Sequence, residues 1–246
     1  MNNIGFGIFC FGDERYFKGS TEKIDNLIKY GYDCYVLSDN PEYFYQKYTP
    51  RFLKVYEYDR TFKSYSDKFN LIKKVSKNHQ ITILIDADTN IIDYSFLDDL
   101  KHYSFKYGIS YIDTLLSHRA RKEFVKDLIN TQHQEWSAYD LYLQKVYPSY
   151  GELQTIWEYF LVVNKNGFNE KRFFEHYEKL QLAKEYSDLG MGKDVNGAGE
   201  GISLSISSKL SDSDLNYDLE LKELLKDKIK PITRHTPLHE LPNFMK

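Results

Sequence analysis

The chain has 246 residues, of which 41% are hydrophobic and 28% are charged, a globular mixture that excludes a disordered protein. Its formal net charge of −3 excludes a globally cationic surface, so we expect no bulk binding of nucleic acid. Its two cysteines, Cys10 and Cys34, are too few for a secreted disulfide scaffold or a cysteine-rich zinc site. No stretch reaches the ~18 apolar residues of a membrane span, and the first residues lack the basic flank of a signal peptide. These features predict a cytoplasmic protein with no transmembrane segment.

The N-terminal third alternates short apolar runs with segments of helical spacing. Four apolar runs predict strands, at residues 4–11, 34–37, 52–58 and 81–85. Residues 21–30 and 66–77 carry apolar side chains at helical spacing. Thr21 is the expected N-cap of the first helix and Gly31 its expected stop. The run at 81–85 is uninterrupted, which is typical of a strand buried on both faces, as in a parallel sheet. Strands that alternate with helices indicate an α/β layer fold, in which ligands bind at the carboxyl ends of the strands.

The rest of the chain continues this mixed pattern. We expect residues 118–146 to be mostly helical, residues 157–163 to form a strand and residues 167–182 to form a helix. Residues 186–201 are rich in glycine and aspartate, which predicts a loop. No internal repeat and no linker divides the chain, so we expect one domain over residues 1–246.

Two aspartates in the segment ILIDADTN are the most informative chemical feature of the chain. Asp86 and Asp88 follow the strand expected at 81–85, and a turn there lets both carboxylates converge on one cation. Carboxylate oxygens suit Mg²⁺ or Mn²⁺, which keep open positions for phosphate oxygens, and such a metal neutralises a diphosphate leaving group. The simplest alternative is a pair of exposed loop aspartates. Phosphatases of the haloacid-dehalogenase type also use Asp-x-Asp after a strand, but their pattern has threonine where this chain has Asn90.

Five segments of the chain resemble the GT-A glycosyltransferases. Within that class they are similar to the retaining family of the ABO blood-group and α1,3-galactosyl transferases and their bacterial relatives (family 6-like). The segments are IGFGIFCFGDERYF, YDCYVLSDNPE, YSDKFNLIKKVSKNHQITILIDADTNI, GEGISLSIS and KIKPITRHTPLHEL. In that order they resemble the family's first strand beside the nucleotide base, its second strand that ends in an acid, its approach to the Asp-x-Asp motif, its glutamate-led helix start and its basic tail.

This resemblance implies a GT-A fold, which is a Rossmann-like mixed sheet flanked by helices. It implies a nucleotide-sugar-binding half at residues 1–90, an acceptor and catalytic half at 91–229, and a tail at 230–246 that closes over the donor. The implied activity is transfer of a hexose from a UDP-sugar to an acceptor hydroxyl, with retention. Asp86 and Asp88 are then the ligands of a Mn²⁺ or Mg²⁺ cofactor. The acceptor, a glycan or another hydroxyl compound, stays open, as does the hexose.

The resemblance also assigns residues to the donor. They are Phe9, Cys10, Phe11, Tyr16, Asp39, Lys68, Ala87, Lys230, Arg234 and His235. Phe9 and Phe11 are equally typical of core residues. Lys68 lies at an expected helix N-terminus, where the helix dipole does not favour a cation, so a phosphate partner or full exposure would explain it. His235 has a second interpretation as a third metal ligand, and the tail cations would stabilise the leaving diphosphate.

One glutamate is the expected catalytic residue. Glu200 follows a glycine-rich stretch, and by resemblance it lies below the anomeric carbon, where a carboxylate stabilises or attacks an oxocarbenium-like centre. Its alternative interpretation is an acid that favours a first helical turn, and Asp194 and Glu158 are the rival carboxylates. Acceptor contacts are expected from Trp157, Glu158 and Tyr159, although a tryptophan in a strand is also typical of core packing.

Three other functions stay open. An inverting GT-A transferase needs a general base at the acceptor hydroxyl, for which Glu158 and Asp194 are the candidates. A nucleotide- or glycan-binding module would hold its ligand without turnover. A nucleotidyltransferase shares the α/β nucleotide-binding sheet, but it normally has an early glycine-rich basic loop. Here the early glycines come with Asp13 and Glu14, which repel phosphate.

Overall fold

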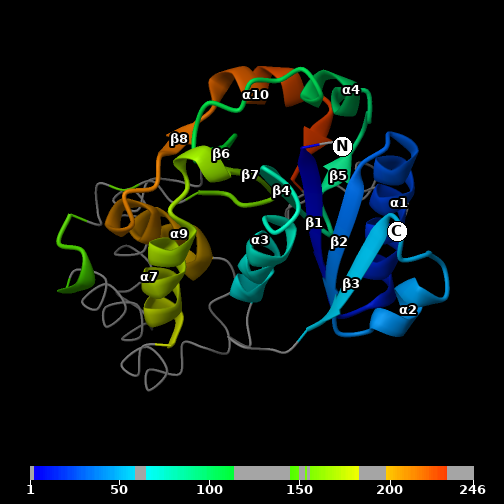
Figure 1. The fold of residues 1–246 in the computed structure, drawn as a ribbon, viewed down its shortest axis with the longest axis horizontal. Helices are drawn as coiled ribbons and strands as arrows, with labels where there is room; N and C mark the ends of the chain where they lie inside the picture. The colour runs from blue at the N-terminus through cyan, green and yellow to red at the C-terminus, as the bar shows by residue number, and fades with distance from the viewer. Residues whose placement is uncertain are drawn as a thin grey trace, which may run out of the picture.

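The computed structural model describes residues 3–58, 65–113, 145–149, 153, 156–182 and 198–231. Within these ranges the framework is a seven-stranded sheet (Figure 1). In spatial order its strands are β3 (Leu53–Glu57), β2 (Asp33–Ser38), β1 (Ile4–Cys10), β4 (Ile81–Asp86), β7 (Phe160–Asn164), β6 (Ile109–Tyr111) and β8 (Leu215–Tyr217). β7 pairs antiparallel with its neighbours β4 and β6, and the other neighbouring pairs are parallel.

The strand directions bring most of the predicted site to one edge of the sheet. Because β7 alone runs the opposite way, its first residues lie at the same edge as the carboxyl ends of the other six strands. The register places Phe9 beside Asp86 and Ile85 beside Phe160. A second, two-stranded sheet begins shortly after β4 in the chain. In it β5 (Asn90–Ile91) pairs antiparallel with β9 (Ile229–Lys230).

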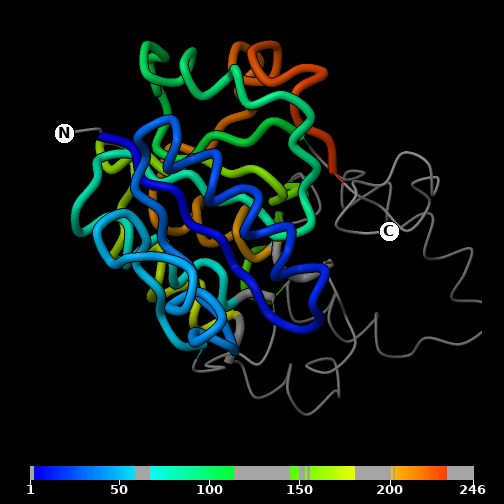
Figure 2. Tube along the Cα trace, turned by 90° about the vertical axis from the view of Figure 1, so that its right-hand side faces the viewer, coloured from blue at the N-terminus to red at the C-terminus, as the bar shows by residue number. Residues whose placement is uncertain are grey.

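Nine helical segments accompany the strands in the described residues. They are α1 (Glu14–Lys29), α2 (Pro41–Tyr45), the 3₁₀ helix η1 (Tyr65–Phe69), α3 (Asn70–Val75), α4 (Phe96–Leu100), the 3₁₀ helix η3 (Lys165–Gly167) with α7 (Glu170–Leu182), α9 (Ala198–Leu210) and α10 (Leu219–Leu225). Figure 2 shows α4 in green and α10 in orange together at one end of the molecule, where they contact each other.

Helices cover both faces of the sheet. On one face, side chains of α1, α4 and α10 form a core with residues of β1 such as Phe6. On the other face, α3, α7 and α9 pack around Phe9 and Leu84. Gly7 faces this second core, where a Cβ would lie 2.7 Å from the Leu84 side chain and 3.2 Å from Leu71 Cβ, so glycine lets α3 approach β1. The predicted fold class, an α/β mixed sheet flanked by helices, is confirmed.

The first helix begins earlier than the sequence analysis predicted. The side chain of Asp13 accepts a hydrogen bond from the Arg15 N–H and caps α1, so the helix starts at Glu14. The predicted N-cap, Thr21, is instead buried within the helix, and that prediction was wrong. The predicted stop at Gly31 is confirmed, because this glycine takes a φ of 83°, a conformation that commonly follows a helix.

Other boundaries differ by a few residues. The strand expected at 157–163 is β7, and the helix expected at 167–182 is α7. The loop expected at 186–201 is wrong at its end, because α9 begins at Ala198. The rest of that range and most of the helix expected at 118–146 lie outside the described residues. No described helix has the length and apolarity that crossing a membrane requires.

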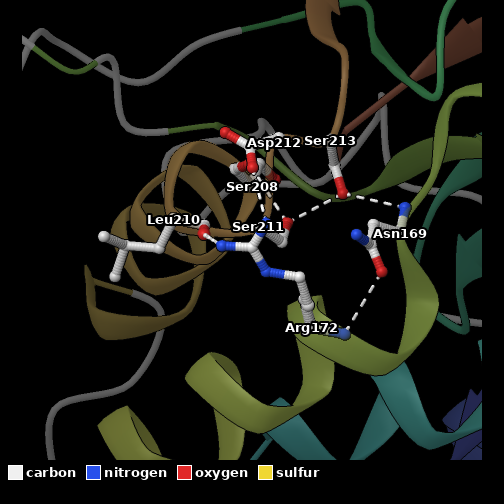
Figure 3. A network of polar contacts seen from close by, with 7 residues as sticks. All are labelled: Asn169, Arg172, Ser208, Leu210, Ser211, Asp212 and Ser213. Atoms are coloured by element: carbon white, nitrogen blue, oxygen red, sulfur yellow. Dashed lines mark hydrogen bonds and ion pairs between the residues drawn. The ribbon is translucent and has the colours of Figure 1, made fainter.

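A polar network fixes the end of α9 that lies away from the predicted site (Figure 3). The Arg172 guanidinium, on α7, donates to the Leu210 carbonyl at 3.3 Å and pairs with Asp212 at 2.7 Å. The hydroxyls of Ser211 and Ser213 are 2.8 Å apart. The Ser213 hydroxyl also accepts a hydrogen bond from the backbone N–H of Asn169, the residue before α7. These contacts bind the C-terminal end of α9 to α7.

Candidate functional site

The acidic pair lies where the sequence analysis expected it, at the end of β4. The Asp86 N–H donates to the Tyr159 carbonyl at 3.2 Å, and the Thr89 N–H donates to the Asp86 carbonyl at 3.1 Å, which closes a turn. The Thr89 hydroxyl also donates to the Tyr159 carbonyl at 3.1 Å. These bonds tie the turn that carries Asp88 to Tyr159, the residue before β7. The acidic pair is therefore held by both β4 and β7.

Lys68 is a buried cation beside the acidic pair. Its Nζ lies 3.1 Å from one Asp86 carboxylate oxygen and 4.0 Å from Glu158 Oε2. The Lys68 and Glu158 side chains are each 6% exposed, and that of Asp86 is 29% exposed. The sequence analysis offered a phosphate partner or a solvated surface position for Lys68. The solvated position is wrong, and the structure adds Asp86 as a partner.

A second buried cation lies on the other side of the turn, and the sequence analysis missed it. Lys23, in the middle of α1, donates to the Ala87 carbonyl at 2.7 Å. Burial lowers its pKa to about 8, although the charge of Asp88 acts in the opposite direction. Its position in the sequence could have revealed it, because Lys23 is spaced from Ser20 and Leu27 so that all three lie on the buried face of α1.

The two aspartates have the chemistry of a divalent-cation site. Burial, and then the charge of Asp86, raise the pKa of Asp88 to about 6. Two neighbouring carboxylates whose charges repel fit two oxygen ligands of Mg²⁺ or Mn²⁺, with the remaining positions left for water and phosphate. The described residues contain no group of three or more histidine, cysteine or acidic side chains arranged for a metal. His235, the predicted third ligand, lies outside the described residues.

The residues predicted for the donor base surround the ends of β1 and β2. Phe9, Phe11 and Tyr58 form an aromatic cluster, with ring centroids 4.8 Å apart for the two phenylalanines and 5.1 Å apart for Phe9 and Tyr58. The Gly12 N–H donates to the Asp39 carboxylate at 3.3 Å, which joins the two strand ends. Phe9 is buried in the core, as its alternative interpretation held, whereas Phe11 is half-buried at the rim.

Two other donor candidates lie on the opposite face of β1. Cys10 is fully buried, and burial raises the pKa of its thiol to about 12, so its side chain is not a reactive group. Tyr16 is half-buried against the same core. Lys230 is exposed on β9, where it pairs in register with Asn90, two residues after Asp88. Arg234, of the predicted tail, lies outside the described residues.

Aromatic side chains line the sheet edge on the other side of Asp86. The ring centroids of Trp157 and Tyr159 are 5.4 Å apart. The backbone N–H of Trp157 donates to the Asp113 carbonyl at 3.1 Å. Tyr111 and Tyr217, at the ends of the parallel strands β6 and β8, have ring centroids 5.8 Å apart, and Tyr217 is 39% exposed. The sequence analysis named Trp157 and Tyr159 but missed the second pair, because their contact depends on long-range strand pairing.

The first turn of α9 lies against this edge. A Cβ on Gly201 would lie 2.1 Å from the Ile156 carbonyl oxygen and 2.9 Å from Glu158 Oε1. Glu200 is the preceding residue in the helix, so the chain places its backbone beside Glu158, which in turn lies beside Lys68. The side chain of Glu200 and all of Asp194 lie outside what the structure describes. Glu158 itself is buried between α9 and Lys68.

We expect Gly201→Ala to destabilise the protein, although alanine is the better helix former by about 1 kcal/mol. The added Cβ would overlap the Ile156 carbonyl, and overpacking of this kind costs about 1–3 kcal/mol. Urea unfolding measures the change in free energy. Lys209→Ala, at an exposed position of the same helix, is the control and should change stability by less than about 0.5 kcal/mol. A Gly201→Ala protein as stable as the control would contradict the close contact.

Comparison with known proteins gives distant structural likenesses. No protein-family model and no curated protein matches the chain. It is similar to a solved protein assigned as a nucleotide-diphospho-sugar transferase from Desulfovibrio desulfuricans G20, at 10% identity and a TM-score of 0.45, over 89% of this chain and 80% of that one. An active-site mutant of LgtC (10% identity, TM-score 0.47, 96% and 81%) and apo mouse xyloside xylosyltransferase 1 (9%, 0.43, 87% and 84%) are also similar. These likenesses are too distant to carry an argument about function, which therefore depends on the residues at the sheet edge.

Proposed function

We propose that the chain is a metal-dependent glycosyltransferase of the GT-A class, which moves a hexose from a UDP-sugar to an acceptor hydroxyl with retention. The observation that carries this proposal is the Asp86–Asp88 pair at the end of the buried strand β4, with a buried lysine on each side of it. An acidic pair at the carboxyl edge of an α/β sheet suits a cation that holds phosphate oxygens.

The nucleotide would bind at the ends of β1 and β2. Phe11 offers aromatic surface there and packs against the buried Tyr58 ring, and Asp39, fixed by the Gly12 N–H, offers a carboxylate for ribose or base. Asp86 and Asp88 would hold the metal, which when bound supplies positive charge that stabilises the leaving diphosphate. Lys68 keeps Asp86 in place through its ion pair.

The acceptor would bind on the opposite side of Asp86. Trp157 and Tyr217 present ring surface there, and an aromatic ring packs well against the apolar C–H face of a sugar. Glu200, in the first turn of α9, is proposed to stabilise the positive charge that develops at the anomeric carbon. Transfer breaks the bond from that carbon to the diphosphate oxygen and forms a bond to the acceptor oxygen, whose proton leaves with the departing group.

The proposal is tested with the purified chain and a panel of nucleotide sugars. UDP-galactose, UDP-N-acetylgalactosamine and UDP-glucose are each added with and without Mn²⁺, and thermal unfolding is followed. A donor present at 100 times its Kd stabilises the folded state by about 2.7 kcal/mol, and we expect that gain only with metal. Release of UDP and the anomeric configuration of the product, read by NMR, then identify a retaining transferase.

Three outcomes would contradict parts of the proposal. Binding that persists without metal and never releases UDP would indicate a nucleotide- or glycan-binding module. A product of inverted configuration would indicate an inverting transferase with a general base near the acceptor. Stabilisation by nucleoside triphosphates alone would favour a nucleotidyltransferase.

A further inference from the structure

Lys23 is a buried cation to which the proposed function gives no role. Its side chain rises from the middle of α1, and its Nζ donates to the Ala87 carbonyl at 2.7 Å and to the Gly19 carbonyl at 3.3 Å. The residue is 1% exposed. Removing an ammonium group from water is costly unless hydrogen bonds and opposite charges compensate. The turn at residues 86–89 provides both, through the Ala87 carbonyl and through the charges of Asp86 and Asp88.

The contact falls on the peptide between the two aspartates. The negative charges of Asp88 and Asp86 both act on the Lys23 ammonium, and that of Asp88 acts more strongly. The 2.7 Å bond itself is made to the Ala87 main chain. Lys23 therefore fixes the Ala87–Asp88 peptide, which leads directly to the Cα of Asp88 and lies one residue after Asp86. This bond occupies no carboxylate oxygen.

The turn has independent ties on its other side. Thr89 bonds through its N–H to the Asp86 carbonyl and through its hydroxyl to the Tyr159 carbonyl. Those bonds hold the turn to β4 and β7, whereas Lys23 holds it to α1. Without Lys23 the Ala87 carbonyl would lose this partner, which would loosen the Ala87–Asp88 peptide on the α1 side. A rotation of that peptide would change the direction of the Asp88 carboxylate relative to that of Asp86.

We propose that Lys23 is a positioning residue for the divalent-cation site, which holds Asp86 and Asp88 in the orientation that binds the metal. This inference rests on the proposed function, because it assumes that the acidic pair binds a cation. Groups that orient metal ligands from behind typically contribute about 10–100-fold to metal affinity. The contribution of Lys23 is therefore measurable with Mn²⁺ alone, in the absence of sugar nucleotide and turnover.

The test is a titration of the full chain with Mn²⁺, in which electron paramagnetic resonance reports the free ion. Lys23→Met keeps most of the side-chain length but removes the charge and the donor, and we expect it to weaken Mn²⁺ binding at least about tenfold. Lys23→Gln, a neutral donor with shorter reach, is the second variant and should show the same loss. It decides the question if Lys23→Met does not fold. Lys23→Arg, which keeps the charge, should recover part of the affinity.

Two controls separate positioning from general destabilisation. Leu27→Ala opens a cavity on the same buried face of α1, so it should lower Tm while it leaves Mn²⁺ affinity within about twofold of the original chain. Lys29→Met makes the same substitution at an exposed position of α1 and should change neither quantity. Folded Lys23 variants with unchanged Mn²⁺ affinity would overturn this inference alone. An original chain that binds no Mn²⁺ would instead overturn the metal-dependent function, and this inference with it.

Discussion

Replacing Asp86 and Asp88 together with asparagine is expected to reduce Mn²⁺-dependent turnover of a UDP-sugar at least about a thousandfold. The reason is loss of the cation that stabilises the leaving diphosphate, a contribution of about 4 kcal/mol to the barrier. Initial rates of UDP release, measured with the donor and acceptor that the screen identifies, give the change. Asparagine keeps the size of each side chain, so a folded double variant is expected by circular dichroism.

The single variants are expected to differ in stability. Ionised Asp86 pairs with Lys68, so Asp86→Asn loses a favourable contact. Asp88 has its pKa raised to about 6 by burial and by Asp86. Ionisation of Asp88 therefore opposes folding at neutral pH, since its stabilising contribution is complete below about pH 4 and is lost as the pH rises through 6. Asp88→Asn removes that penalty, so it should lower activity without lowering Tm.

A matched control is available on α4. Asp98 and Asp99 pair with Lys101 and Lys228 at the surface, where ion pairs contribute less than about 1 kcal/mol. Their double replacement by asparagine removes the same two charges from another part of the chain. Activity that falls equally in both double variants would mean that net charge, and not the acidic pair, controls the rate.

The sequence predicted the framework of the site because its strongest signals are local. An uninterrupted apolar run before Asp86 predicted a buried strand, and the two acids that follow it predicted a site at the carboxyl edge of the sheet. Both statements need only neighbouring residues. The same is true of Gly31, whose place after a helical run was enough to predict the end of α1.

The features that the sequence did not predict depend on contacts between distant segments. Lys23 looks like an ordinary helical lysine, and the sequence analysis named Lys68 without its partner Asp86. Both contacts form only when α1 and η1 pack against the turn after β4. Tyr111 and Tyr217 meet because β6 and β8 pair in parallel across a long separation in the chain. The predicted start of α1 was wrong for a different reason. The sequence analysis placed the N-cap at Thr21, whereas the side chain of Asp13 caps the helix one residue before Glu14.

Lys68→Met is expected to have the largest effect on stability, a loss of about 3–5 kcal/mol of unfolding free energy. The substitution removes the cation that lies 3.1 Å from Asp86 and 4.0 Å from Glu158. Glu158 is buried, so without this countercharge its ionised form is strongly disfavoured. Urea unfolding at neutral pH measures the loss.

A double-mutant cycle distinguishes this explanation from a packing defect. If the cost of Lys68→Met arises from a buried charge that has lost its countercharge, adding Glu158→Gln should restore part of the lost stability. If it arises from packing, the two losses should add. Lys73→Met is the control, because Lys73 pairs with Glu178 at a position where both side chains are more than a third exposed, and such a pair contributes less than about 1 kcal/mol. A Lys68→Met protein that loses no more stability than Lys73→Met would show that the ion pair beside the acidic turn does not stabilise the fold.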